Sequence, residues 1–379
     1  MELNIPTFDF DSPLTEAVFE LERLRGDLAL TDTDPDVLVQ IGEVLRLVTS
    51  MTSARIEGNR TTVLDVVTEK AEASKTQKSD SVQEVINLEG ASQFIDEHIE
   101  PGGPLTQAFV RELHHLAVDG LIAEGDKRPG SYRTTPVAIA GTEHTPPGPD
   151  LVPALMTELV DFINAERSRN QDLVATAISH HRFLWIHPFG NGNGRVARLL
   201  TYAMLVQQGF TQTTSFRALN PTAVFGADRE KYYERLSAAD RYDNQGLVEW
   251  CEYVLVGLRQ DLSRVKSLGD ASFVLKRLFI PAIDGLLRSA LVTADEAAVL
   301  RTTATRGVVK AGDLAGAIPG SPSTRSQAIR KMLDRHLLES LPDSPRSYRL
   351  CLTTGPLVLA VIRQLEDLGF VPEIMRKAI

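Results

Sequence analysis

The chain has 379 residues and a formal net charge of −10 at pH 7, with 43% hydrophobic and 24% charged residues. That length predicts two or three domains, and the composition excludes a wholly disordered chain. The two cysteines, Cys251 and Cys351, are too few for a disulfide framework or a thiolate zinc site. The overall negative charge argues against a protein whose whole surface is basic and binds nucleic acid.

The N-terminus lacks the basic start and apolar stretch of a signal peptide, and no run of about 18 apolar residues is present. We therefore expect a cytoplasmic protein without a membrane partner. Charge is unevenly distributed, because residues 281–379 hold 13 Lys+Arg against 10 Asp+Glu while the preceding residues are acidic. This shift predicts a domain boundary near residues 268–280.

The pattern of apolar residues predicts a mostly helical chain. Residues 38–48 repeat apolar side chains with helical spacing, and residues 81–99, 104–118 and 150–166 show similar periods. Residues 172–186 are apolar on all sides, which predicts a buried central helix. Residues 195–209 resume helical spacing and stop at Gly209, a typical C-cap. Residues 132–141 are short and β-branched, which predicts a small strand or hairpin.

The strongest chemical signal is the segment HPFGNGNGRVAR at residues 187–198. Its three alternating glycines let backbone N–H groups converge on one point, and the following helix directs its N-terminus there, which favours an anion. Arg195 and Arg198 share one face of that helix, so both can reach the same phosphate group. His187 can act as a general base near neutral pH. The alternative is a glycine-rich turn between helices with a surface histidine.

This segment resembles the signature of Fic-domain proteins, H-x-F-x-[D/E]-G-N-G-R-x-x-R, and the resemblance covers roughly residues 35–260. It implies an all-α Fic fold with a small β-hairpin flap, and the C-terminal winged-helix-like region described below lies outside the span of this resemblance. It also implies adenylylation, in which AMP moves from ATP to a hydroxyl side chain of a target protein.

The resemblance assigns roles residue by residue. His187 would deprotonate the target hydroxyl, Phe189 would anchor the loop, and Arg195 and Arg198 would grip the β- and γ-phosphates. Tyr232 and Tyr233 resemble a tyrosine pair beside the adenine, although they also fit core aromatics. The nucleotide-binding set is then Phe189, Gly190, Asn191, Gly192, Asn193, Gly194, Arg195, Arg198, Tyr232 and Tyr233.

A target-docking flap is also implied. It would align the backbone of the target protein by strand addition. Its residues would be Val137, Ala138, Ile139, Ala140 and Gly141.

One position departs from the family signature, because Asn191 stands where the signature has Asp or Glu. That acid normally holds the Mg²⁺ of the triphosphate, and an amide oxygen is a weaker ligand for a hard cation. We therefore expect Mg²⁺ to be weakly held, with Asn191 as a poor metal ligand. Asn191 leaves open a slow enzyme, another nucleotide, or a nucleotide-binding domain without catalysis.

A second motif lies upstream in TSARIEGN, where Ser53, Glu57 and Gly58 match the inhibitory motif [S/T]-x-x-x-E-[G/N] of the same family. In this interpretation Glu57 pairs with Arg198 and withdraws it from the γ-phosphate. The alternative is a short helical turn ended by Gly58.

The C-terminal region suggests a winged helix. Residues 312–318, a turn at residues 319–322 and residues 323–341 predict a helix-turn-helix, and residues 338–353 predict two strands with a wing between them. Four basic residues lie on or near the second helix, namely Arg325, Arg330, Lys331 and Arg335. The slight basic balance favours packing or protein contact over DNA binding.

We therefore expect an N-terminal helical region with the inhibitory motif at residues 1–100, a Fic core at residues 101–265 and a winged-helix-like domain at residues 275–379. Three functions fit these residues. The first is an autoinhibited protein adenylyltransferase that binds ATP and a protein bearing Ser, Thr or Tyr. The second is a related enzyme that uses another nucleotide or removes AMP. The third is a nucleotide-sensing regulator that binds DNA through residues 311–352. Each of these three functions is compatible with a homodimer.

Overall fold

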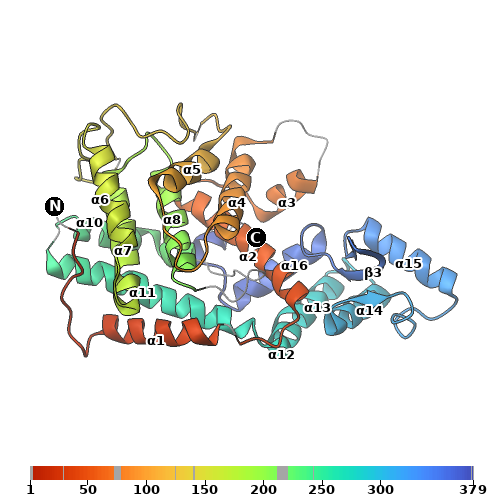
Figure 1. Cartoon of the computed structure of the whole chain (residues 1–379). Helices are drawn as coiled ribbons and strands as arrows, with labels where there is room; N and C mark the ends of the chain where they lie inside the picture. Colours follow the sequence, from red (N-terminus) through yellow and green to blue (C-terminus); the bar gives the residue numbers. More distant parts are fainter. Residues whose placement is uncertain are drawn as a thin grey trace.

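The computed structural model describes residues 3–28, 30–71, 78–123, 125–139, 141–210, 221–241, 243–376 and 378. Within them the chain is mostly helical (Figure 1). The helices before residue 270 are α1 Pro13–Asp27, α2 Pro35–Ile56, α3 Val63–Ala71, α4 Asp80–His98, α5 Gln107–Val118, α6 Val152–Asn164, α7 Arg169–Ile186, α8 Asn193–Gln207, α9 Pro221–Ala227, α10 Arg229–Ala239 and α11 Asn244–Ser267.

The later part holds the helices α12 Ala271–Phe273, α13 Ile280–Arg288, α14 Ala294–Arg306, α15 Pro322–Asp334 and α16 Pro356–Asp367, with a π-helical stretch Val274–Phe279 and a 3₁₀ turn Glu373–Met375. It also holds the strands β1 Val309–Lys310, β2 Leu338–Leu341 and β3 Ser344–Leu350, which form an antiparallel sheet in the order β1-β3-β2. Among the described helices, none is long and apolar enough to cross a membrane.

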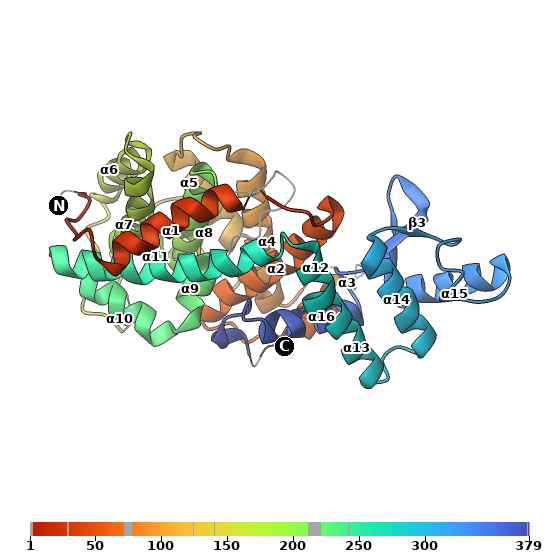
Figure 2. The ribbon, with the colours of Figure 1, turned by 90° about the horizontal axis from the view of Figure 1, so that it is seen from below.

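The helix α7 lies at the centre of the larger part of the molecule, as its sequence predicts. Residues Leu173–Phe183 are buried on every side of it, and α8 follows it through the glycine-rich segment. The long helix α11 runs under this pair, and α1 packs lengthwise against α11 (Figure 2). Because α7 and α8 are fixed by neighbours on all sides, the loop between them is held from both ends.

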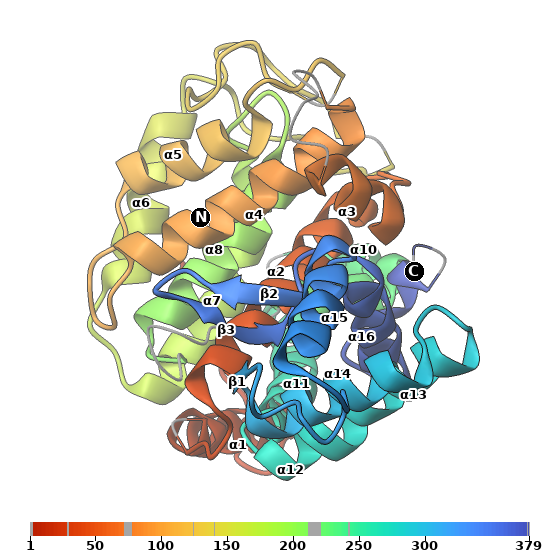
Figure 3. The same ribbon diagram turned by 90° about the vertical axis from the view of Figure 1, so that its right-hand side faces the viewer.

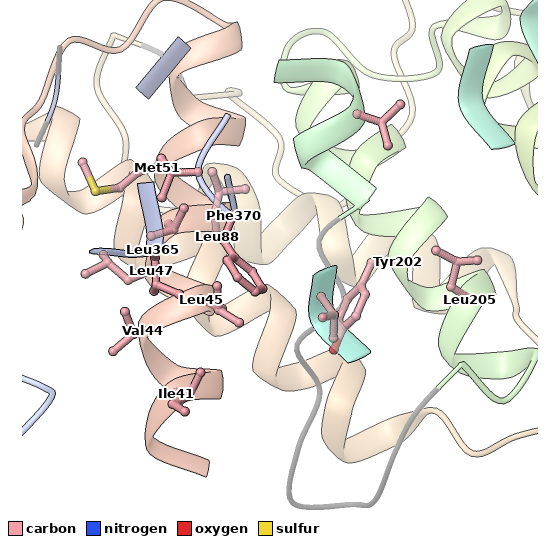
Figure 4. Close-up of a cluster of buried hydrophobic side chains, with 14 of the residues drawn as sticks. Ile41, Val44, Leu45, Leu47, Met51, Leu88, Tyr202, Leu205, Leu365 and Phe370 are labelled. Carbon is pink, nitrogen blue, oxygen red and sulfur yellow. The ribbon is translucent and has the colours of Figure 1, made fainter. Parts of the chain in front are cut away.

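The helix α2 joins the two ends of the molecule. Asp34 caps its first turn by accepting N–H groups from residues 36 and 37. Its middle packs its apolar face against α4 and the C-terminal helix α16 (Figure 4), through the buried side chains Ile41, Val44, Leu45, Leu47, Met51, Leu88, Leu365 and Phe370. Burying each such side chain stabilises the fold by roughly 1.5–3 kcal/mol.

The C-terminal sheet and α15 lie at the end of the molecule far from α7 and α8 (Figure 1), which is the end that faces the viewer in Figure 3. β3 is the central strand, and it pairs with β1 at Val309 and with β2 at Leu338. The turn between β2 and β3 is short, because Leu341 already faces Ser344.

Two predicted elements are wrong. Residues 132–141 form no strand within their described part, since no second strand pairs with them and prolines follow at positions 146 and 147. Residues 312–318 form successive turns rather than a helix, because Gly312 and Gly316 weaken helical propensity and Pro319 ends the segment. The helices at residues 38–48, 81–99, 104–118, 150–166, 172–186 and 195–209 are confirmed, and Gly209 does end α8 in the left-handed conformation.

Candidate active site

The glycine-rich segment forms a tight loop between α7 and α8. His187 follows α7 with φ of 51° and ψ of 60°, a left-handed conformation that is uncommon for a residue with a side chain. Gly192 also has a positive φ, of 74°, immediately before α8 begins at Asn193. Backbone held in such regions is characteristic of functional sites, where the surrounding structure supports the strain.

Two side chains of the loop are buried and fix its shape. Phe189 is fully buried and stacks on the ring of His114, with ring centroids 3.8 Å apart. Asn193 accepts the N–H of Phe189 and donates to its carbonyl oxygen, each at 3.0 Å. The loop is therefore preorganised, with both of these side chains turned into the protein.

His187 has the properties of a general base. Burial lowers its pKa to about 4, so the imidazole is neutral at pH 7. Its Nδ1 lies 3.3 Å from the carbonyl oxygen of Leu184, which favours the proton on Nδ1 and leaves Nε2 as the proton acceptor. The guanidinium of Arg133 donates to the carbonyl oxygen of His187 at 2.8 Å, and so holds its backbone.

The predicted partners Ser53, Glu57 and Arg198 meet in the structure. Arg198 donates through Nη2 to Glu57 Oε1 at 2.7 Å and through Nε to Ser53 Oγ at 2.9 Å. It also donates to the Ser53 carbonyl oxygen at 3.1 Å. The surrounding protein would raise the pKa of Glu57 by desolvation, but the Arg198 charge and hydrogen bond outweigh this, and the pKa lies below its usual value. Glu57 is therefore a carboxylate that holds Arg198 on α2.

The Glu57 carboxylate also stands at the N-terminus of α8. A Cβ at position 194 would overlap its Oε1, so only glycine allows this approach. The N-terminus of a helix is an anion site, because its first N–H groups have no partner within the helix. Gly58, with φ of 109°, gives the turn that ends α2 and presents Glu57 there. Glu57 thus occupies the anion site at the N-terminus of α8.

Arg195 lies apart from Arg198 and is buried. Its Nη1 donates to Glu84 Oε1 at 2.9 Å, and the two side chains are only 1% and 3% exposed. Asn59, two residues after Glu57, donates to the other Glu84 oxygen at 2.8 Å. Sequence reasoning missed Glu84, although one signal was present: this acid lies at helical spacing from Leu88 and Ala91 on the buried face of α4.

Asn191 is engaged within its own loop. Its Oδ1 accepts the N–H of Gly192 at 2.7 Å, and its Nδ2 lies 3.4 Å from the Gly125 carbonyl oxygen. Asp126, which sequence reasoning also missed, accepts the N–H groups of Gly190 and Asn191 at 3.0 and 3.2 Å. Among the described residues no cluster of three acids, histidines or cysteines could hold a metal ion. The neutral Asn191 amide oxygen is thus already engaged by the Gly192 N–H, which makes it a poor ligand for Mg²⁺.

The two tyrosines lie in different environments. Tyr232 is buried, and its hydroxyl bonds to Nε2 of His180 at 3.0 Å, so it is a core aromatic. Tyr233 is 40% exposed, and the guanidinium of Arg229 lies over its ring. Of the pair, only Tyr233 presents a ring to a ligand.

The predicted flap has no regular secondary structure in its described residues. Ala138 and Gly141 are exposed, Val137 and Ile139 are half-buried, and Ala140 lies outside the described residues. The segment is anchored beside the loop, because Arg133 donates to the Pro147 carbonyl oxygen at 2.5 Å and Nε2 of His144 lies 2.8 Å from that of Trp185. Arg133, which sequence reasoning missed, therefore connects this segment to His187.

A model of the Fic/DOC family matches residues 104–205. The protein adenylyltransferase Fic of Drosophila willistoni is 29% identical over 204 residues, which are 52% of this chain and 38% of the relative. That of Culex quinquefasciatus is 29% identical over 203 residues, with the same two shares. The chain thus spans about two-fifths of the length of the curated relatives it matches.

Solved structures share the fold at low sequence identity. A Fic family protein from Desulfovibrio desulfuricans superposes with a TM-score of 0.56 at 24% identity, covering 91% of this chain and 98% of that chain. Fic-1 of C. elegans gives 0.52 at 23% identity, covering 66% and 71%. The chain therefore has the mostly helical Fic fold with a small three-stranded antiparallel sheet, residues 104–205 match the model of the Fic/DOC family, and the relatives it resembles include protein adenylyltransferases.

Proposed function

We propose that this protein is an adenylyltransferase that moves AMP from ATP to a hydroxyl side chain of another protein, and that Glu57 holds it inactive. The observation that carries the proposal is the pairing of Arg198 with Glu57 and Ser53 beside a neutral, half-buried His187. Relatives named as protein adenylyltransferases support the reaction class.

The nucleotide would bind at the N-terminus of α8. Nη1 of Arg198 is buried without a hydrogen-bond partner among the described residues, and it lies beside Gly194. An unpaired buried guanidinium N–H is costly, and a phosphate oxygen would satisfy it. Tyr233 is the exposed aromatic ring near this end of the site.

His187 would start the transfer. Its Nε2 takes the proton of a Ser, Thr or Tyr hydroxyl as that oxygen attacks the α-phosphorus of ATP. A new bond joins the target oxygen to phosphorus, the bond between the α-phosphorus and its bridging oxygen breaks, and pyrophosphate leaves. Mg²⁺ would arrive with the triphosphate and neutralise its charge. No described cluster of side chains holds this ion in place.

The segment at residues 137–141 would dock the target. Its backbone forms no ladder within its described part, so its N–H and C=O groups are open to a strand from another chain. Because Arg133 connects this segment to the His187 backbone, the docked hydroxyl would arrive beside Nε2.

Removal of AMP, or use of another nucleotide, is the second candidate. Asn191 favours it, because the amide lacks the charge that the usual acid provides for metal-bound ATP, and its oxygen is already engaged by Gly192.

The test compares three full-length proteins with ATP labelled on the α-phosphate: wild type, Glu57→Gly and the matched control Glu100→Gly. Glu100 is an exposed glutamate that, like Glu57, follows the end of a helix. We expect Glu57→Gly alone to show strong labelling of itself or of lysate proteins, and intact-protein mass spectrometry should find the mass of one AMP.

Three other outcomes are informative. Equal labelling of a folded Glu57→Gly variant and wild type would remove the autoinhibition. Absence of transfer from every protein, together with loss of AMP from an adenylylated substrate, would select the second candidate. Labelling from another nucleotide alone would also select it.

A further inference from the structure

The helix α15 is held to the molecule by one face only. Ile329 and Met332 are buried beneath it against β2, whereas Ser323, Gln327 and Arg330 are exposed. These three residues have the spacing i, i+4 and i+7, so they form one outward stripe of the helix. Figure 3 shows α15 on the outer side of the sheet, with no other helix covering it.

The outward side of this region carries cations without carboxylate partners. Arg330 and Lys331 on α15 and Arg346 at the start of β3 are exposed, and none forms an ion pair with a described residue. Nearby arginines that face the rest of the unit are paired, namely Arg306 with Asp313, Arg335 with Glu296 and Arg349 with Glu339. The outside of α15 therefore carries positive charge without an ion-pair partner, while the β2–β3 turn places the exposed Asp343 near Arg346 in the sequence.

The acidic character of the chain does not oppose this local charge. The excess of acids belongs to residues 1–280, which lie mainly at the other end of the molecule (Figure 1). Exposed charges further apart than about 8 Å are largely screened at physiological salt. Asp334, the acid on α15 itself, is its last helical residue.

We propose that residues 294–352 form a winged helix that binds double-stranded DNA. The element order α14-β1-α15-β2-β3 and the strand order β1-β3-β2 place one free helix beside one short hairpin. Ser323 and Gln327, near the N-terminus of α15, face the base edges in the major groove. Arg330, Lys331 and Arg346 contact phosphates on either side of the groove.

The dimensions select DNA over RNA. The major groove of B-DNA is about 12 Å wide and admits one α-helix, whereas the groove of A-form RNA is too narrow and deep for one. A single exposed helix that carries hydroxyl and amide side chains toward its N-terminus and an arginine after them therefore matches duplex DNA.

The experiment measures fluorescence anisotropy of a labelled duplex of random sequence, about three helical turns long, with the full chain over a series of KCl concentrations. We expect log Kd to vary linearly with log salt with a slope of about 2 to 3, as befits the few phosphate contacts assigned. The variant R330A/K331A should lower affinity about tenfold at low salt and reduce the slope by about 2.

The matched control is Arg363→Ala, which removes an exposed arginine from α16 on another face of the molecule. It should leave affinity and slope unchanged, and circular dichroism confirms that each variant is folded. Gln327→Ala should keep the slope but change the sequences selected from a random DNA pool, because a base contact carries no counterion.

Several results would overturn the proposal. They are no salt-dependent binding by the wild type, equal loss in Arg363→Ala and R330A/K331A, or duplex RNA competing as well as duplex DNA. Binding of a protein partner at α15 without DNA binding would also overturn it. The assay uses no nucleotide, so its result is independent of AMP transfer.

Discussion

The two ends of this molecule differ in whether their basic side chains are buried and paired or exposed to solvent. Around α8 the arginines Arg195 and Arg198 are buried, and each is paired with a glutamate from another helix. On α15 the side chains of Arg330 and Lys331 are exposed, and neither forms an ion pair with a described acid. A buried charge must be paired to be tolerated, whereas an exposed charge is solvated by water until a partner arrives. The paired interior charges fix the arrangement of the helices around α8, whereas the exposed charges on α15 are available to a charged partner.

The helix α2 touches both regions. Its Gln40 donates to the Leu350 carbonyl oxygen at 2.6 Å, at the end of β3, and Glu57 caps its other end. With 22 residues it spans about 33 Å. The buried and the exposed charges can therefore be tested separately, because they lie near opposite ends of the one helix α2.

The largest effect is expected at His187, measured in the Glu57→Gly background so that activity is visible. His187→Ala removes the only assigned proton acceptor while leaving Arg198 and the α8 N-terminus intact. Transfer should fall roughly 10²–10⁴-fold, and calorimetric ATP affinity should change little. A variant that labels its target at the rate of the parent would contradict the assignment of His187 as base.

The next effect contrasts a buried pair with an exposed one. Glu84→Gln leaves the Arg195 guanidinium buried without its countercharge, and we expect unfolding free energy to fall by about 3 kcal/mol. Glu249→Gln breaks a surface pair with Arg235 and should cost less than about 1 kcal/mol. Urea unfolding compares them. Similar losses in the two variants would show that the Glu84 pair is not a buried ion pair in solution.

A further effect on stability concerns pH. Burial lowers the pKa of His114 and of His187 to about 4, so the unfolded chain binds more protons than the folded chain between pH 6.5 and 4. Stability from these groups is complete above pH 6.5 and is lost as pH falls to 4, by about 1 kcal/mol per pH unit for each histidine. Urea unfolding at pH 7, 5.5 and 4.5 measures it. A flat profile in this window would mean that the rings are charged or solvated when folded.

The smallest effect is expected at Asn191. Asn191→Asp places a carboxylate against the Gly125 carbonyl oxygen and close to the Asp126 carboxylate. Affinity for ATP in chelator should fall a few-fold, by repulsion, and adding Asp126→Asn should recover part of it. Calorimetry with and without Mg²⁺ compares the two single variants with the double variant. If Asp126→Asn has the same effect on affinity in the wild-type background as in the Asn191→Asp background, the two side chains do not interact.

Periodicity was enough to predict six of the sixteen described α-helices. The apolar spacing of α2, α4, α5, α6 and α8 and the uniform apolarity of α7 identified them, because burying an apolar face needs the period of a helix. The segment at residues 132–141 shows the limit of this approach. A strand needs a partner, and local β propensity does not say whether one is present.

The features of the site also fall into two groups: those that local sequence predicts and those that only tertiary structure decides. The local order of residues in HPFGNGNGRVAR determined the loop, its glycines and the placing of His187 at its entrance, because backbone freedom and helix start signals act over a few residues. Tertiary structure alone decided that Arg195 faces Glu84, that Tyr232 lies in the core while Tyr233 is exposed, and that Asp126 and Arg133 support the loop. The hydrogen bonds among these contacts join residues 54 to 111 positions apart, and only the packing of whole helices brings such residues together.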